Sequence, residues 1–457
     1  MSEQRLHELA AFAAQTSLRD VPEAVLENAR RSFTDTLACI LGGASMQPVR
    51  TLASVLHSPG HAARIIGTPY RSHPYHAAFV GGVAGTWMDA DSGGTKHPAG
   101  GRVPPVPTAH PAVHLLPALL AAVGADRAMG GEELLRIYLV SHEAGARIGS
   151  ATRLLPGIHP HGVHGTSSAA LAVGLARKLE TAALARSMEL ATALPLVTAL
   201  HVAMSGATVR NAYAGIGARN GMMAAEAATH GVSAPGGAFD AVLARGLSDA
   251  IDEVRLLARL GDDWESSRAY IKPHACARWI HPALDAVASL LPPEPLDPES
   301  VDSIEVRTFR FAAMMNDPHP ATDLGAKFSV PYSVAALVCY GRVELEAFSP
   351  VAMARPDLRR LAERVRVLED PEYTAALPER RPTTVTIHSR DGRVASSSVE
   401  GGRGDPEDPL TQEELEGKFM RLAGASLGAE RAAQSLQLLR RLPELPSLDP
   451  LLECLTP

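Results

Sequence analysis

Small and aliphatic residues recur with helical periodicity through the first 230 residues, and this pattern constrains the fold more than any other feature. Of all residues 46% are hydrophobic but only 4% are aromatic, so Ala, Leu and Val must fill the core. Small side chains let helix axes approach closely. We therefore expect a mainly α fold with helices over 3–18, 22–43, 77–87, 115–123, 132–148, 168–179, 181–203 and 212–230.

After about Trp264 the pattern changes to period two, which is typical of strands. Val301–Phe309, Thr383–His388 and Arg393–Val399 alternate, and Asp391-Gly392 predicts a hairpin turn between the last two. The tail returns to helix, begun by a capping box of Thr411 and Glu414. We expect a large all-helical domain, discontinuous over 1–264 and 405–457, and a smaller α+β lid domain over 265–404.

Charge and cysteine content exclude several classes of protein. The net charge of −7 and the lack of a long basic run argue against a nucleic-acid ligand. The four cysteines are too scattered for a disulfide framework or a zinc ribbon. The N-terminus lacks the layout of a signal peptide, and no apolar run is long enough to cross a membrane. We expect a soluble cytoplasmic protein without membrane partners.

The stretch from Trp87 to Pro117 interrupts the helical pattern with prolines and glycines, which cannot continue a helix. Long loops inside compact domains are usually functional. This one gathers polar side chains of both charge signs, namely Asp89, Asp91, Thr95, Lys96, His97, Arg102, His110 and His114. We expect a functional loop.

A second polar interruption, His159–Thr166, carries three histidines at His159, His161 and His164. A helix starting just after Gly165 would point free N–H groups and a positive dipole end at this loop, which suits an anion. The histidine spacing cannot face one ion from a regular helix, and no HExxH motif is present, so we assign no metal here.

Two cations stand out downstream. Lys272 precedes a proline, which holds its backbone extended, and a partly desolvated lysine can transfer protons. Arg210 could clamp a carboxylate, because a guanidinium matches that group with two parallel hydrogen bonds. A solvated surface position is the alternative for each. The glycines in GIGARNG, residues 215–221, have the wrong spacing for a dinucleotide loop, and no strand precedes them.

Several motifs in order along the chain resemble the MmgE/PrpD family. They are FTDTLACILGGAS, MDADSG, HPAVHLLPALLA, SHEAGARIG, HPHGVHGTSSAALAVGLARKL, VRNAYAGIGARNGMMAAEAA, KPHACARWIHPALDA, AKFSVPYSVAALV and RGDPEDPLTQEELEGKF. The family includes 2-methylcitrate dehydratase, cis-aconitate decarboxylase and iminodisuccinate epimerase. The resemblance covers nearly the whole length.

The resemblance implies a helical domain plus an α+β lid, an active site between them, a homodimer, and neither metal nor organic cofactor. By motif position, Asp89, His110, His159, Arg210 and Lys272 match functional positions of the family. We expect catalytic roles for Lys272, His159, Asp89, His110 and His142, with Asp89 orienting His110. We expect substrate-binding roles for Arg210, Thr95, His97, His161 and Arg278. The shared chemistry is proton removal next to a carboxylate of a small di- or tricarboxylate.

Departures from the family pattern separate the possible reactions. Ser92-Gly93 stands where the decarboxylase and dehydratase have aspartate and threonine, and Ala277 replaces a decarboxylase histidine. His142 replaces a tyrosine of the epimerase. We expect a lyase of the 2-methylcitrate dehydratase type, with an epimerase as the alternative. A metal-dependent hydrolase using His97, His110, His159 and His161, or an inactive helical partner protein, are the remaining interpretations.

Overall fold

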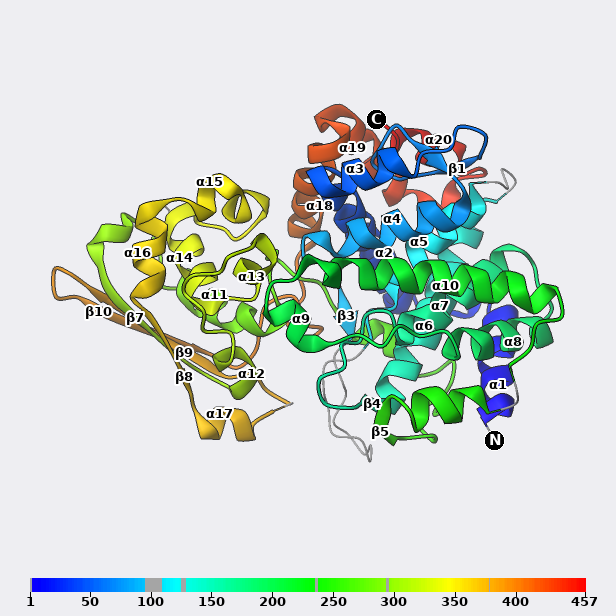
Figure 1. The fold of residues 1–457 in the computed structure, drawn as a ribbon, viewed down its shortest axis with the longest axis horizontal. Helices are drawn as coiled ribbons and strands as arrows, with labels where there is room; N and C mark the ends of the chain where they lie inside the picture. The colour runs from blue at the N-terminus through cyan, green and yellow to red at the C-terminus, as the bar shows by residue number, and fades with distance from the viewer. Residues whose placement is uncertain (1, 95–108, 125–128, 235–236, 293–295, 378) are drawn as a thin grey trace.

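The computed structural model describes residues 2–94, 109–124, 129–234, 237–292, 296–377 and 379–457. Figure 1 shows two lobes, a larger one built of helices and a smaller one built on a sheet. The mainly α fold predicted from the sequence is confirmed, with a small mixed sheet in the C-terminal part. The division at residues 264 and 404 stays a prediction.

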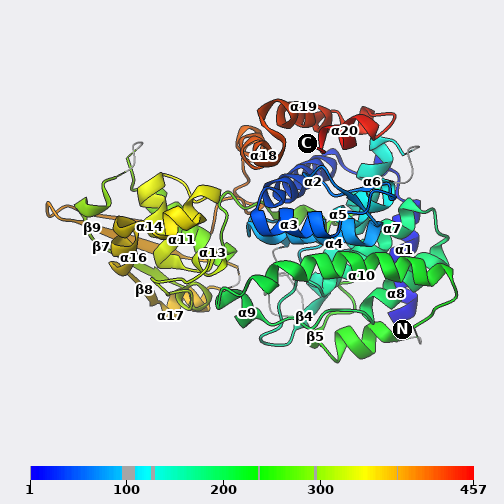
Figure 2. The same cartoon turned by 45° about the horizontal axis from the view of Figure 1, so that its top comes forward.

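The larger lobe packs long helices around an Ala- and Leu-rich core (Figure 2). Its N-terminal helices are α1 Ser2–Gln15, α2 Glu23–Ala44, α3 Gln47–Val55, α4 Pro74–Trp87, α5 Ala112–Val123, α6 Gly131–Ala151, α7 His164–Ala176, α8 Thr181–Thr192, α9 Leu200–Met204 and α10 Ala212–Thr229. Helices α4 and α5 are central. Helix α4 contacts α2, α5 and α10, and α5 contacts α4, α7 and α10.

The C-terminal segment packs back onto this lobe, as the sequence predicted. It forms α18 Gln412–Leu427, α19 Ala429–Arg440 and α20 Asp449–Cys454, and α18 lies along α2. The predicted capping box is present, since Thr411 and Glu414 each accept a hydrogen bond from the other's backbone N–H. Helix α18, near the C-terminus, therefore stabilises α2, near the N-terminus.

The smaller lobe holds a four-stranded sheet in the order β10-β9-β7-β8. The strands are β7 Val301–Thr308, β8 Val365–Glu369, β9 Thr383–Ser389 and β10 Val394–Val399. The predicted β9–β10 hairpin is confirmed, and β8 was not predicted; it pairs parallel to β7. The accompanying helices are α11 His281–Ala288, α12 Arg310–Ala313, α13 Asp323–Lys327, α14 Val330–Tyr340, α15 Pro350–Met353, α16 Pro356–Glu363 and α17 Pro371–Ala375.

Three predicted boundaries were wrong. Helix α7 begins at His164 rather than 168, and α8 ends at Thr192 rather than 203 because the chain then runs into Pro195. Helix α5 begins at Ala112 rather than 115, and Pro117 lies inside it. The larger lobe also contains unpredicted two-residue to four-residue ladders: β1 Ala63–Arg64 with β2 Arg71–Ser72, β3 Gly93–Gly94 with β6 Ala269–Tyr270, and β4 Thr152–Leu154 with β5 Ser248–Ile251. Within the described ranges, no helix combines the length and hydrophobicity needed to cross a lipid bilayer.

Helices α4 and α10 touch through glycine. A Cβ atom added at Gly82 would lie 2.6 Å from the Cα of Gly215, which no real contact allows. This close approach holds α4 against α10, with Asp89, just after α4, bound to Arg210, just before α10.

We expect Gly82→Ala to lower the free energy of unfolding by about 1–3 kcal/mol, because the added methyl group forces the two helices apart. Gly424→Ala is the matched control, since a Cβ at this position in α18 meets no atom within 4 Å. That change should raise the free energy of unfolding by roughly 0.5–1 kcal/mol. Chemical denaturation measures both, and equal effects of the two changes would contradict the close-packing argument.

Candidate active site

The chain leaving α4 places Asp89 in a buried, strained position. Its φ of 50° is uncommon for a residue with a side chain, and such strain persists only where the surroundings enforce it. The Asp89 carboxylate lies 2.6 Å from Arg210 and 3.3 Å from the Lys272 amine. The same amine donates to the Asp89 carbonyl at 2.7 Å. The structure therefore brings together three of the predicted site residues.

Four buried cations donate to backbone carbonyls between residues 86 and 90. Arg210 donates to the Thr86 carbonyl at 3.1 Å, and Lys272 donates to the Asp89 carbonyl at 2.7 Å. Lys327 of α13 donates to the Trp87 carbonyl at 3.0 Å, and Lys418 of α18 donates to the Ala90 carbonyl at 2.9 Å. The carbonyl end of a helix attracts positive charge, so these cations fix the turn that carries the aspartates.

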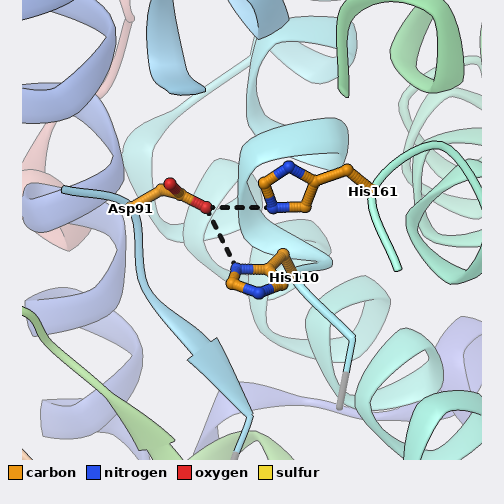
Figure 3. Close-up of side chains that lie close together, drawn as sticks. All are labelled: Asp91, His110 and His161. Atoms are coloured by element: carbon orange, nitrogen blue, oxygen red, sulfur yellow. Dashed lines mark ion pairs between the residues drawn. The ribbon is translucent and has the colours of Figure 1, made fainter. Parts of the chain in front are cut away.

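Asp91 lies two residues further on and contacts two imidazoles (Figure 3). Its Oδ2 atom is 3.0 Å from Nδ1 of His110 and 3.2 Å from Nε2 of His161. The prediction that Asp89 orients His110 was wrong, because Asp89 is bound by Arg210 and Lys272 instead. The partner of His110 is Asp91.

Hydrogen bonds assign the proton positions on two of these rings. His110 Nδ1 lies 2.9 Å from the Ser92 carbonyl, which can only accept, so this nitrogen carries a hydrogen and the Nε2 lone pair is left free. Figure 3 shows that second nitrogen pointing away from Asp91. Both ring nitrogens of His114 already have hydrogen-bond partners. Its Nδ1 donates to the His110 carbonyl at 2.7 Å, and its Nε2 accepts from the N–H of Gly162 at 2.8 Å. His110 therefore has a free basic nitrogen, Nε2; among the described residues, Nδ1 of the completely buried His161 also has no hydrogen-bond partner.

His159 has the opposite tautomer. Its Nδ1 accepts the backbone N–H of His161 at 3.1 Å, so a neutral ring carries its hydrogen on Nε2. Its ring centroid lies 4.7 Å from that of His161 and 5.9 Å from that of Tyr213. His159 can thus donate a hydrogen bond but has no free lone pair.

Burial keeps the rings of His159 and His161 neutral. Burial, reinforced by the nearby Arg210, holds the pKa of His159 well below its ordinary value, and burial with the neighbouring His110 does the same for the pKa of His161. Burial would raise the pKa of Asp91, but the two imidazoles outweigh it and hold that pKa well below the ordinary range. The cluster therefore combines an ionised Asp91 with uncharged rings at His159 and His161.

Asp91, His110 and His161 could also be considered as metal ligands. Among the residues that the structure describes, they are the group whose donor atoms lie within 4.8 Å of one another. The hydrogen on His110 Nδ1 points at the Ser92 carbonyl, so the nitrogen nearest Asp91 has no lone pair to offer. The hydrogen-bonded arrangement fits the contacts better than metal ligation.

The other predicted residues lie outside this cluster or outside the described chain. Thr95 and His97 are not among the described residues. His142 is buried in α6 with its ring edge-on to Tyr138 at 5.7 Å, and burial lowers its pKa to about 4. Arg278 contacts Asp405 at 2.7 Å and donates to the Gly402 carbonyl, so it serves a structural network.

Sequence reasoning assigned no individual catalytic or binding role to four residues of the site, which are Asp91, Lys327, Lys418 and Tyr270. Lys327 and Lys418 are isolated lysines in helices, a pattern that normally indicates a solvated position. Tyr270 packs its ring 6.3 Å from that of His110, and a Cβ at Gly93 would lie 2.5 Å from the Tyr270 hydroxyl. The Asp-x-Asp spacing of residues 89–91 was the one available signal, because it offers two carboxylates from a single turn.

Buried neutral histidines make the fold sensitive to acid. Burial lowers the pKa of both His114 and His142 to about 4, whereas an unfolded histidine titrates near about 6.5. Below about pH 6.5 the unfolded chain therefore binds more protons than the folded one. The free energy of unfolding consequently decreases as the pH is lowered. We expect each of these two rings to lower the free energy of unfolding by about 2 kcal/mol when the pH is lowered from 7 to 5. Chemical denaturation of His142→Leu should show a loss smaller than the wild-type loss by that amount, whereas His230→Gln, at an exposed position, should match the wild type.

Comparisons with known proteins identify the family of this chain. The MmgE/PrpD N-terminal domain model matches residues 7–253, and the MmgE/PrpD C-terminal domain model matches residues 274–443. A cis-aconitate decarboxylase of Aspergillus terreus is 26% identical, covering 98% of this chain and 95% of that protein. Cis-aconitate decarboxylases of Mus musculus and Homo sapiens are 25% and 24% identical, covering 93% and 92% of this chain and 87% and 88% of theirs. This chain belongs to the MmgE/PrpD family.

Proposed function

We propose that the protein is a lyase that removes a proton next to a carboxylate of a small di- or tricarboxylate and expels a β-hydroxyl group as water. Family membership supports the enzyme class and the carboxylate substrate. The observation that carries the proposal is the Asp91–His110 pair, because the Nε2 nitrogen of His110 is free and this ring is more exposed than the other imidazole that contacts Asp91.

His110 is the base in this proposal. Its Nδ1 donates to the Ser92 carbonyl, which orients the ring, and the Asp91 carboxylate, 3.0 Å from the same nitrogen, stabilises the imidazolium that forms when Nε2 takes the proton. His110 is 8% exposed, slightly more than Asp91 and His161, at 1% and 0%. The carbon–hydrogen bond breaks, and its electron pair delocalises into the carboxylate as an enolate.

The enolate needs positive charge and hydrogen-bond donors. The Lys272 amine and the Nε2 hydrogen of His159 provide them, and both groups belong to the same buried cluster. The enolate then forms a double bond while the β-hydroxyl leaves with a proton from Lys272. Arg210 acts indirectly, because its guanidinium is bound to Asp89 rather than free to clamp the substrate.

Decarboxylation is a second candidate, favoured by the relatives named cis-aconitate decarboxylase. Loss of CO₂ would generate a carbanion at the same place, which Lys272 or the protonated His110 would then neutralise. Epimerisation would require proton return to the opposite face of the carbon. We further propose a cofactor-independent homodimer; the exposed apolar side chains of Leu194 and Val197 support an interface on that face.

Incubation of the protein with a panel of di- and tricarboxylates in D₂O, followed by proton NMR, distinguishes these reactions. Elimination, CO₂ loss and exchange without net change give different spectra. We expect elimination from a β-hydroxy acid, with a rate unaffected by a chelator. Loss of activity with chelator, restored by zinc, would instead support a metal-dependent hydrolase. Failure of every acid to react or to raise the Tm would overturn the proposal.

We expect His110→Gln to lower kcat by about 10²–10⁴, because general base catalysis contributes that much. The same variant should lose exchange of the substrate hydrogen with D₂O. Lys272→Met should lose elimination but keep slow exchange, because the base is intact. His230→Gln, which changes an exposed histidine, is the control and should react at the wild-type rate. If Lys272→Met lost exchange and His110→Gln kept it, the two roles would have to be reversed.

A further inference from the structure

We propose that Lys418 and Asp35 are positioning residues: together they fix the peptide between Asp89 and Asp91 and so set where both carboxylates point. The kinetic consequence rests on the function proposed above, whereas the structural consequence does not.

The pair lies beneath the turn and is almost completely buried. The Lys418 amine of α18 is 2.5 Å from Oδ1 of Asp35 on α2, and the two residues are 5% and 0% exposed. The amine also donates to the Ala90 carbonyl at 2.9 Å. Lys418 therefore holds the carbonyl oxygen of Ala90 and is itself held in place by Asp35.

The Ala90 peptide is the link between two differently bound carboxylates. Asp89, on one side, binds Arg210 and Lys272, and Asp91, on the other side, contacts His110 and His161. Rotation of this peptide would move both carboxylates at once. Lys272 holds the Asp89 carbonyl and Lys418 holds the Ala90 carbonyl, so the two amines fix successive peptides of the turn.

Helix docking alone does not account for the pair. Phe419 and Leu422 already bury apolar surface of α18, and Leu422 packs 3.0 Å from the position of a Cβ on Gly42 in α2. Replacing a buried ion pair with apolar residues of similar size is often neutral or stabilising, because the charges no longer have to be desolvated. A pair needed only for stability could therefore be replaced without loss, whereas a pair that holds Ala90 could not.

This difference gives the test. Lys418→Met leaves Asp35 charged and unpaired, so we expect a lower Tm and a kcat at least about 10-fold lower, with KM within about threefold of the wild type. The double variant Asp35→Leu with Lys418→Met removes both charges and should recover most of the lost Tm. Its kcat should stay low, because the Ala90 carbonyl still lacks its donor.

Asp370→Asn is the control for destabilisation. It removes the ion pair to Arg307 in the smaller lobe, so it should lower the Tm but leave kcat unchanged. Recovery of kcat together with Tm in the double variant would overturn the proposal, because the pair would then be purely structural.

A second measurement is independent of any substrate. The ring nitrogen NMR signals of His110 and His161 report their contacts with Asp91, and we expect both to shift in the double variant while the signal of exposed His230 stays in place. Unchanged signals would overturn the positioning role even if kcat fell. If no carboxylate reacted with the wild type, the proposed function would fail, but this measurement would still decide whether the pair positions the turn.

Discussion

Cations from four separate parts of the chain bind the carbonyls of Thr86 and Trp87 at the end of α4 and of Asp89 and Ala90 in the turn that follows, and the site depends on this interaction. Arg210 precedes α10, Lys272 follows β6, Lys327 comes from α13 in the smaller lobe, and Lys418 comes from the C-terminal segment. A helix ends in carbonyl groups without partners, which carry partial negative charge. Because distant segments all satisfy the same few carbonyls, the turn at 86–91 is fixed only when the whole fold is assembled.

The cost of burying these cations is offset by paired carboxylates. Lys418 is bound to Asp35, Lys327 lies 3.3 Å from Asp323, and Arg210 shares Asp89 with Lys272. A buried charge without a partner would cost several kcal/mol. Each cation therefore contacts a carbonyl of the turn and a carboxylate nearby, which restricts where it can lie and gives the turn a single arrangement.

The general fold was accessible from the sequence because its signals are local. The helical periodicity, the alternation of β7 and β9 and the capping box at Thr411 each involve only neighbouring residues. The polar interruptions at Asp89, His159 and Lys272 were also recognisable, and the structure brings them together. Their composition alone indicated that they do not belong in a packed helical core.

The pairing within the site was not accessible, because it depends on tertiary distances. Asp89 and Asp91 are two residues apart and chemically identical, so the sequence could not assign one to the cations and the other to the imidazoles. Lys327 and Lys418 could not be distinguished from solvated helix lysines. The ladder between β3 and β6 spans two residues on each strand, too short for a periodicity, yet it places Gly93 beside Tyr270.

That ladder also explains why a small residue stands next to the aspartates. At Gly93 a Cβ would lie 2.5 Å from the Tyr270 hydroxyl and 2.7 Å from the His110 ring, so any side chain there would displace one of them. Because His110 is held on one side by this ring and on the other by Asp91, Gly93 is part of what orients the proposed base, although it has no side chain to contribute.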